Sequence, residues 1–555
     1  MKHWYIYTGV IMMTMMSAGG CGRNPEYADL IFMNGTVFTG TEKGVVQSVA
    51  IRGETILDTG TDEEMLAYRD SSTVCVDLHK AFACAGFNDA HLHLVMGGLN
   101  MLQVDLTGVT TVREMQRRVA NAIHTTQPGA WIVGWGWDQN LFKDKQWPDR
   151  KALDVIAPDI PIFLKRVCGH AVLVNTKALR IANITRQTPD PAGGEIMRDS
   201  RTGRATGIIK ETAIELVEQY IPEPPEDQEV QAVRKALSEF RRLGITSVQD
   251  NTSGDILKIY RDLQEKGELT CRISEMVPYD TGLDRCEKLR AEYTGDFLRF
   301  GLIKEFADGS LGARSAAMIQ PYLDDPSNSG LARYSQEDLN AMVAEADRRG
   351  FQMGIHAIGN RANAMVLDAY EYARNVNGPR DARHRIEHSQ ILTKNDVSRF
   401  ADMGVVASMQ PFHCIGDLHW VESVIGKEQC RYAYAWQSLV SAGAPVAFGT
   451  DWPVVPLNPL ESIYAAVTRQ DTSGFPAAGW HREERLTPEQ ALAAYTAGSA
   501  YAEFMEHKKG VLAKGMLADI VVLDRNILDC DPLKILETRV VYTLVGGSIV
   551  YSAGQ

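Results

Sequence analysis

Gly86-Phe87-Asn88-Asp89-Ala90-His91-Leu92-His93 is the stretch around which the rest of the chain is arranged. It closes an apolar run with a His-x-His pair, and residues two apart on a β-strand project from the same face. A strand over 83–93 would therefore carry both imidazoles on one side of its C-terminal end. Two neutral imidazoles placed in this way can bind one divalent metal of the zinc type. The pair alone is a weak indication and needs support from elsewhere.

That support comes from four further potential ligands, each near the end of a short apolar run: Lys304, His356, His388 and Asp451. Between 245 and 449 such runs alternate with helical patterns, which predicts βα units and a parallel sheet. Strands are expected at 245–248, 302–306, 352–356, 385–388, 405–409 and 445–449. In a (β/α)8 TIM-type barrel the functional groups gather at the C-terminal ends of the strands, and these residues fall there. The fold class is therefore α/β.

Both ends of the chain are rich in β patterns. Residues 28–32 and 36–38 flank Asn34-Gly35, and 46–52 and 55–58 flank Gly53, so each pair is expected to form a hairpin. Similar strands recur at 519–524 and 540–551. We expect one small β-sandwich built jointly from 27–83 and about 510–555, with separate β domains as the alternative. The barrel would then occupy 84–505.

A long, less regular segment at about 110–228 interrupts the barrel pattern. It contains several tryptophans early on, among them Trp135. We expect an insertion over the barrel mouth, where Trp135 could help to shape a substrate pocket. Packing of these aromatic rings in the insertion's own core is an equal alternative.

Composition narrows the partners. The chain has 555 residues, 45% hydrophobic and 23% charged, as in an ordinary globular protein. A net charge of −13 argues against nucleic acid or an anionic membrane surface as a partner. A small-molecule substrate is expected. A homo-oligomer is compatible with the sequence, which does not specify one.

The first twenty residues have the pattern of a secretory signal: Lys2, an apolar run over 4–16, and small residues before Cys21. A cysteine in this position resembles the lipid-modified residue of bacterial lipoproteins, although Ala18 stands where leucine is usual. We therefore expect an exported protein of the periplasm or cell envelope that is lipid-anchored at Cys21. An ordinary signal cut nearby is the alternative. No other stretch is long and apolar enough for a transmembrane helix.

Five motifs in order resemble the amidohydrolase superfamily, in particular amidohydrolase family three, which includes N-substituted formamide deformylases. They are 85–93, Ile303-Lys304-Glu305-Phe306-Ala307-Asp308-Gly309-Ser310, 355–362, His384-Arg385-Ile386-Glu387-His388 and Gly449-Thr450-Asp451-Trp452-Pro453. The resemblance runs from about Ala28 to Tyr551. It implies a metal-dependent hydrolase with a (β/α)8 barrel and a composite β domain. The motifs specify the family much better than the substrate.

Carried over motif by motif, the resemblance implies metal ligation by His91, His93, His356, His388 and Asp451. Lys304 stands where members of the superfamily carry a carboxylated lysine that bridges two metals. A plain ammonium paired with Glu305 or Asp308 is the alternative. Ala85 replaces a usual proline and Asn360 a common aspartate, and neither is a proposed ligand.

Softer assignments come from the same resemblance. His413, after Gln410-Pro411-Phe412, could polarise the scissile carbonyl or serve as a structural imidazole. His170 resembles a substrate-side histidine of the family. Apart from the resemblance, Arg314 could contact an anionic substrate group, with an ordinary surface arginine as the alternative.

One competing motif has to be weighed. His384-x-x-Glu387-His388 matches the motif of inverted zinc peptidases, which requires a helix. Gly378-Pro379 ends the preceding helix here and 385–388 is expected to be a strand, so we reject the peptidase assignment.

The predicted activity is hydrolysis of a non-peptide C–N bond with one or two divalent metals, zinc expected. Asp451 would act as general base and then general acid, with His413 assisting. The same site could instead serve a cyclic deaminase or an esterase. A non-catalytic metal-binding lipoprotein is the alternative from another class.

Overall fold

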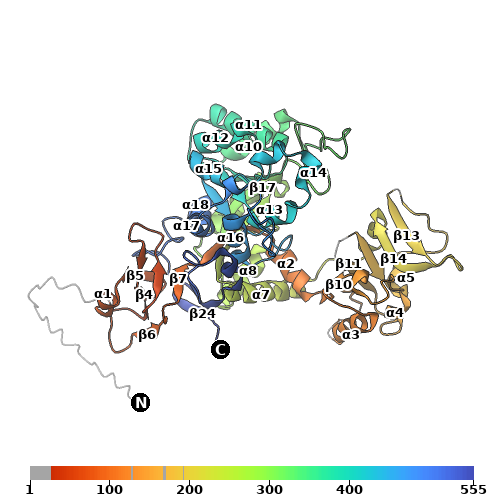
Figure 1. The fold of residues 1–555 in the computed structure, drawn as a ribbon, viewed down its shortest axis with the longest axis horizontal. Coiled ribbons are helices and arrows are strands. Elements are labelled where there is room, and N and C mark those ends of the chain that lie inside the picture. Colours follow the sequence, from red (N-terminus) through yellow and green to blue (C-terminus); the bar gives the residue numbers. More distant parts are fainter. Residues whose placement is uncertain (1–26, 125, 127–128, 167–169, 192, 555) are drawn as a thin grey trace, which may run out of the picture.

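The computed structural model describes residues 27–124, 126, 129–166, 170–191 and 193–554. The expected signal segment 1–20 and Cys21 lie outside these residues. Figure 1 shows three bodies side by side, a β domain, a central barrel and a lobe. Among the described helices, none has both the length and the apolar composition needed to cross a membrane.

The central body is the predicted α/β barrel of eight parallel strands, which follow one another in sequence order. They are β8 (Phe87–Leu92), β15 (Ile245–Asn251), β16 (Arg272–Pro278), β17 (Leu298–Phe306), β18 (Met353–Ala357), β19 (Arg385–His388), β20 (Val406–Met409) and β21 (Val446–Phe448). The first and last strands lie next to each other and nearly close the ring, and just after β21 the Asp451 backbone N–H donates to the His91 carbonyl of β8 at 2.7 Å.

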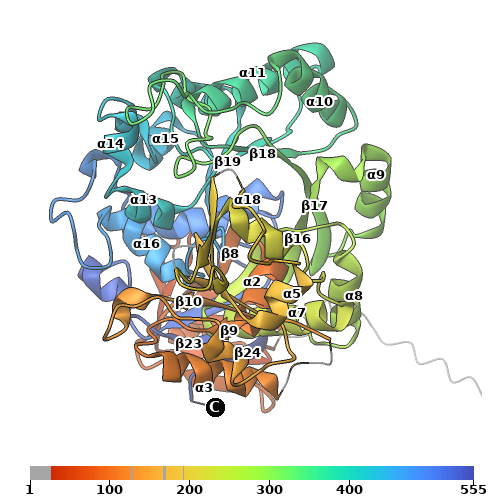
Figure 2. The same cartoon turned by 90° about the vertical axis from the view of Figure 1, so that its right-hand side faces the viewer.

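Helices surround the barrel strands (Figure 2). The principal ones are α2 (Leu94–Leu102), α7 (Glu226–Arg242), α8 (Leu257–Glu265), α9 (Leu283–Glu292), α10 (Gln336–Arg348), α11 (Asn360–Asn377), α12 (Lys394–Met403), α15 (Trp436–Ala442) and α16 (Pro459–Thr468). Gly244, with φ of +76°, turns the chain from α7 into β15. A Cβ there would lie 2.4 Å from Val521, so this tight turn requires glycine.

One barrel strand, β16, is missing from the sequence-based list. Arg272 and Glu275 interrupt its apolar pattern, yet both are buried. Arg272 pairs with Asp519 of the β domain at 2.7 Å, which accounts for its burial. A charge with a partner far along the chain thus hides the strand from pattern reading.

The β domain takes strands from both ends of the chain. One sheet has the order β5 (Thr55–Gly60), β4 (Ser48–Arg52), β1 (Leu30–Met33) and β6 (Val74–Asp77). The other has the order β24 (Ser548–Ser552), β23 (Val540–Val545), β22 (Ile520–Leu523), β7 (Phe82–Ala85), β2 (Thr36–Phe38) and β3 (Val45–Val46). Phe32, Val37 and Val522 share one apolar cluster between them.

Two expectations for this domain need correction. β4 and β5 form the expected hairpin, but β1 and β2 do not, because the turn at Asn34 carries the chain from one sheet to the other. The single strand expected over 83–93 is divided at Gly86 into β7 of the β domain and β8 of the barrel. A Cβ on Gly86 would lie 2.2 Å from Thr246, so the crossing between the two bodies is close-packed.

The described residues between 104 and 221 form the lobe. Its sheet has the order β13 (Gly194–Arg198), β14 (Ala205–Glu211), β12 (Ala171–Val174), β11 (Ile162–Arg166), β10 (Ile132–Trp137) and β9 (Val104–Asp105). Each face of the sheet has an apolar cluster built from lobe residues, one containing Trp137 and Leu164, the other Phe163 and Ile209.

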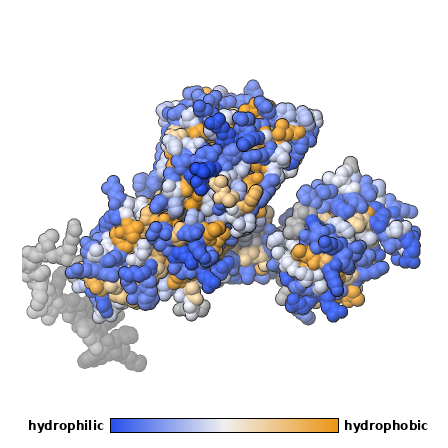
Figure 3. Space-filling model, in the orientation of Figure 1, coloured by the Kyte–Doolittle hydropathy of each residue, from blue (hydrophilic) through white to orange (hydrophobic). Residues whose placement is uncertain are grey.

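The lobe lies on the side of the barrel opposite the β domain (Figure 1), and its expected placement over the barrel mouth stays a prediction. Figures 1 and 3 show it standing apart from the barrel, to which it connects after α2 and before α7. Side chains of the lobe cover both faces of its sheet, so among the described residues no apolar sheet face is left that must pack on the barrel.

Candidate metal centre at the barrel mouth

The His-x-His pair and Asp451 form the first half of the site. His91 lies in β8, and His93 follows it as the N-cap of α2. The Nε2 atoms of His91 and His93 lie 3.5 Å and 3.2 Å from Asp451 Oδ1. Ligands about 2.1 Å from a tetrahedral zinc ion are about 3.4 Å from one another. These separations therefore fit a metal position.

The second ring nitrogen of each histidine is held by the protein. His91 Nδ1–H donates to Glu387 Oε2 at 2.8 Å, and His93 Nδ1–H donates to the Asn251 carbonyl at 2.9 Å. Such partners fix the tautomer and leave Nε2 as the ligand atom. Burial lowers the pKa of His91, which favours the neutral form that a metal needs.

Asp451 is a buried carboxylate that stays ionised. Burial raises its pKa, but His93, His388 and His91 outweigh burial and hold the pKa well below its usual range. The backbone of Asp451 has φ of +61° and that of His388 φ of +74°, in the left-handed region that non-glycine residues rarely adopt. Such strain gathers at functional sites, which supports a functional role for both residues.

Asp89 holds the first and last strands in register. Its Oδ1 accepts the backbone N–H of His91 at 3.1 Å and that of Thr450 at 3.0 Å, and its Oδ2 accepts the Thr450 hydroxyl at 2.6 Å. These bonds tie together the residue that carries one imidazole and the residue before Asp451. The separation of the two ligands therefore depends on Asp89.

Glu387 and Arg385 lie beneath the site. Arg385 donates to both Glu387 oxygens, at 2.8 Å and 3.1 Å, and to the Ala90 carbonyl at 2.6 Å. Burial raises the pKa of Glu387, but Arg385 and His91 outweigh it and hold the pKa well below its usual range. Neither residue has a role assigned from the sequence. The available signal was the pair of charges inside a four-residue strand.

A second group lies on the other side of Asp451. His388 Nδ1–H donates to Gln410 Oε1 at 2.7 Å, so Nε2 is the nitrogen left for a metal. His413 Nε2 lies 3.6 Å from Asp451 Oδ2, and the His388 and His413 rings are nearly parallel at 6.0 Å. Potential ligand atoms of His388, His413 and Asp451 lie within 4.8 Å of one another, as do those of His91, His93 and Asp451.

His356 and Lys304 border the site with side chains bonded elsewhere. His356 Nε2–H donates to the Gly309 carbonyl at 3.0 Å, and its ring contacts that of His388 at 4.5 Å. Lys304 is buried, donates to the Glu305 carbonyl at 3.1 Å and lies 3.5 Å from the centre of the Phe306 ring. Burial lowers the pKa of Lys304 to about 8.

The residues predicted to contact substrate are not brought to this centre. Arg314 donates to Asp324, at 2.6 Å for the shortest contact, and to the carbonyl of Leu311, so its guanidinium is committed to its own loop. His170 lies in the lobe and pairs with Glu211 at 3.0 Å. Trp135, also in the lobe, is 42% exposed.

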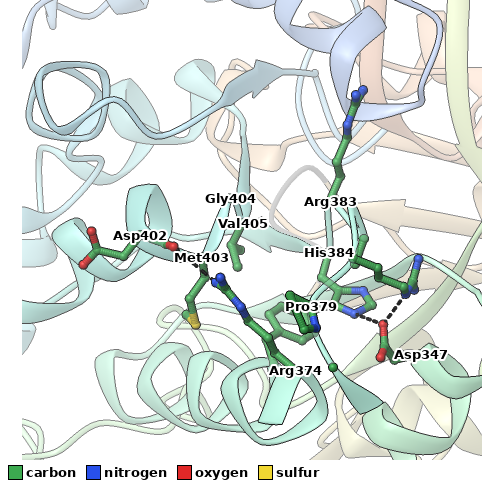
Figure 4. Close-up of a pocket in the computed structure, with 13 residues that line it drawn as sticks. Asp347, Arg374, Pro379, Arg383, His384, Asp402, Met403, Gly404 and Val405 are labelled. Atoms are coloured by element: carbon green, nitrogen blue, oxygen red, sulfur yellow. Dashed lines mark hydrogen bonds and ion pairs between the residues drawn. The ribbon is translucent and has the colours of Figure 1, made fainter. Parts of the chain in front are cut away.

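The position of His384, just before β19, excludes the inverted zinc peptidase motif that the sequence also matches. His384 directly precedes the strand and His388 ends it, so the two histidines lie at opposite ends of the barrel. His384 lines the pocket of Figure 4, where His384 and Arg380 both donate to Asp347, at 3.1 Å and 2.6 Å. The peptidase motif requires a helix, and the structure has a strand.

Known proteins resemble this chain in sequence and in fold. The sequence model described as the amidohydrolase family matches residues 74–551. Protein LONG AFTER FAR-RED 3 of Arabidopsis thaliana is 36% identical over 94% of this chain and 92% of its own. N-substituted formamide deformylase of Arthrobacter pascens is 27% identical over 95% and 99%. The crystal structure of a metal-dependent hydrolase from Pyrococcus furiosus superposes with a TM-score of 0.73 at 31% identity, covering 91% and 100%.

Proposed function

The chain belongs to the amidohydrolase family, and on that premise we propose that it hydrolyses the C–N bond of a small, non-peptide amide. Metal-dependent hydrolysis is the family's chemistry, and the choice of bond is our proposal. The observation that carries it is the convergence of His91 Nε2 and His93 Nε2 on Asp451. The relative named as an N-substituted formamide deformylase supports it.

Zinc is the metal we propose, held by His91, His93 and Asp451. When bound, such an ion supplies Lewis acidity, which lowers the pKa of water towards about 7 and polarises a carbonyl group. The nitrogen and carboxylate donors of this group, and their separations, are those that zinc prefers. His388, His356 and Lys304 stand beside them as candidates for a second ion.

Asp451 carries the proton in this proposal. Its ionised carboxylate accepts a proton from the attacking water and donates it to the leaving nitrogen, as a positioned general base and acid. His413 Nε2 faces the same carboxylate. Two roles fit a buried imidazole nitrogen there: donating to the carbonyl oxygen of the substrate, or ligating a metal.

Carboxylation of Lys304 is a further part of the proposal. A pKa of about 8 leaves an appreciable neutral fraction near neutral pH, and the neutral amine is the form that adds to carbon dioxide. Lys304→Ala should then lower bound metal, and bicarbonate should assist reconstitution of metal-stripped protein. A crystal structure with metal bound beside an unmodified ammonium would rule this out and leave a one-metal mechanism standing.

A substrate panel tests the reaction. The metal-replete protein is assayed with N-substituted formamides and other amides, with ring C=N compounds and with esters, and amine, ammonia and alcohol are measured separately. Amine release supports the proposal, whereas ammonia from a ring substrate favours a deaminase and alcohol an esterase. The His91→Ala/His93→Ala double variant is the control and should be inactive and metal-poor. Metal binding without any turnover would favour the non-catalytic metal-binding protein.

Export with a lipid anchor at Cys21 is proposed from the composition of the first twenty-one residues. Cys21→Ser should release the protein from membranes and leave its catalysis unchanged. Native protein found in the cytoplasm with Met1 retained would contradict the proposal.

A further inference from the structure

We propose that Glu275 is a neutral carboxylic acid that donates a hydrogen bond to Asp250, and that this pair positions His93 by capping helix α2 in place of the His93 side chain. Neither carboxyl group belongs to the proposed metal ligands. The neutral state of Glu275 follows from the packing around it, whereas the positioning role rests on the metal site of the proposed function.

Two carboxyl groups face each other inside the barrel. Asp250 of β15 and Glu275 of β16 are paired directly across neighbouring strands. Both residues are fully buried, and their side chains are close enough to share a hydrogen bond. Arg272, on the same strand as Glu275, has an ionic partner in Asp519, but no basic side chain in the described part of the chain pairs with either carboxyl group. Two buried carboxylates in contact cannot both stay ionised without a cation, so one of them holds a proton.

The hydrogen-bond donors around the pair assign the proton to Glu275. Asp250 Oδ1 accepts from the Leu94 N–H at 2.7 Å, and Oδ2 accepts from the hydroxyls of Thr252 and Tyr260 at 2.9 Å and 2.6 Å. Glu275 Oε1 accepts only the Thr252 N–H, at 3.1 Å, and Oε2 is buried without a donor from any described residue. A negative charge is stabilised where donors gather, which places it on Asp250. Burial and the charge of Asp250 both raise the pKa of Glu275 well above its ordinary value.

The carboxylate of Asp250 caps helix α2. His93 is the N-cap residue of this helix, but its side chain bonds none of the helical N–H groups. The His93 Nδ1–H donates instead to the carbonyl of Asn251, the residue after Asp250, and Nε2 faces Asp451. The first N–H groups of a helix lack partners within the helix and favour an anion. Because Asp250 supplies that anion to the Leu94 N–H, the His93 imidazole is left for the metal site.

Infrared difference spectroscopy tests the proton. Spectra of the full-length, metal-replete wild type and of Glu275→Gln are recorded at neutral pH in H₂O and in D₂O. The wild type should show the C=O stretching band of a protonated carboxylic acid, which shifts in D₂O and which Glu275→Gln lacks. Glu484→Gln is the matched control and should keep the band. Glu484 is also buried, but both of its oxygens accept from Ser438, so it needs no proton.

Zinc titration of the chelator-stripped variants, without substrate, tests the positioning role. The amide N–H of Glu275→Gln can still donate to Asp250, so this variant should bind zinc as tightly as the wild type. Glu275→Met keeps the length of the side chain but cannot donate, and zinc binding should weaken at least about tenfold. A purely structural role would lower the melting temperature of Glu275→Met and leave its zinc affinity unchanged. Glu275→Ala is the second variant should the methionine protein fold poorly.

Each half of the proposal has a result that would overturn it. A protonated-acid band of equal intensity in the wild type and Glu275→Gln, or no such band in either, would show that Glu275 is ionised. Wild-type zinc affinity in Glu275→Met, or equally weak binding in Glu275→Gln and Glu275→Met, would remove the positioning role. A wild type that binds no zinc would overturn the proposed function together with the positioning role, and the infrared band would still decide where the proton lies.

Discussion

The two ends of β19 each have a buried histidine, and the two are used in opposite ways. At the N-terminal end both nitrogens of His384 are bonded within the protein, Nδ1 accepting from the Met353 N–H and Nε2–H donating to Asp347, each at 3.1 Å. At the C-terminal end His388 makes one side-chain hydrogen bond, from Nδ1–H to Gln410, and its other nitrogen is near Asp451. The backbone of His388 has a positive φ. Complete pairing stabilises the fold, and incomplete pairing leaves a nitrogen for a ligand.

Asp451→Asn removes the carboxylate at the C-terminal end of the barrel and should have the largest effect on turnover. An amide oxygen can still coordinate weakly but cannot accept a proton, so turnover should fall at least about 10²-fold while most of the metal remains bound. Turnover, metal content and melting temperature measured on one preparation check this. Near-normal turnover would remove Asp451 from the mechanism, and a loss of stability alone would make it a structural residue.

Glu387→Gln tests whether metal binding at the barrel mouth depends on the hydrogen bond between Glu387 and His91. The amide keeps the shape but accepts less strongly from His91 Nδ1–H, so metal affinity should fall about 10- to 100-fold. The matched control is Glu503→Gln, a buried carboxylate at the other end of the barrel that pairs with Lys509 at 2.9 Å. The control should leave metal affinity unchanged. Equal affinity in both variants would show that His91 is oriented by other groups.

His384→Gln breaks the N-terminal end and should affect stability only. Loss of two buried hydrogen bonds should cost about 1–3 kcal/mol of unfolding free energy, with unchanged metal content and turnover. The chelated protein can be compared by denaturant titration. A fall in turnover at full metal occupancy would contradict the division between the two ends.

The contribution of His384 to the free energy of unfolding should decrease as the pH falls. Burial lowers the pKa of His384 below its ordinary value of 6.5, so the unfolded chain binds a proton that the folded chain does not. The contribution of His384 is therefore complete above pH 6.5 and declines as the pH falls below it. The wild type should lose more stability than His384→Gln between pH 7.5 and pH 5.5, as melting temperatures would show. Equal losses of stability in the wild type and in His384→Gln would show that His384 does not cause this pH dependence.

His170→Ala should have the smallest effect. His170 is exposed on a lobe that stands apart from the barrel, so KM and turnover should change by less than about twofold. A tenfold rise in KM would show instead that the lobe contributes to the substrate pocket, as the sequence led us to expect. Trp135→Ala, on the same lobe, repeats the test with a larger side chain.

Local pattern predicted much of the barrel because apolar runs and their spacing are properties of short segments. The expected strand at 385–388 coincides with β19, and 245–248, 302–306 and 405–409 fall on β15, β17 and β20. The potential ligands His91, His93, His388 and Asp451 are likewise residue types placed at strand ends, and the structure brings them together. The number of these residues and their order along the chain can be read directly from the sequence.

Tertiary structure alone decided the rest. Which nitrogen of His91 faces the site depends on Glu387, 296 positions away, and the register of Asp451 depends on Asp89, 361 positions from Thr450. Burial of Arg272 in β16 requires Asp519, 247 positions away. Periodicity is read within one turn or strand, whereas hydrogen-bond partners come from segments that only folding brings together. The sequence therefore determined which residue types could bind a metal, and the fold determined which of their atoms face the site.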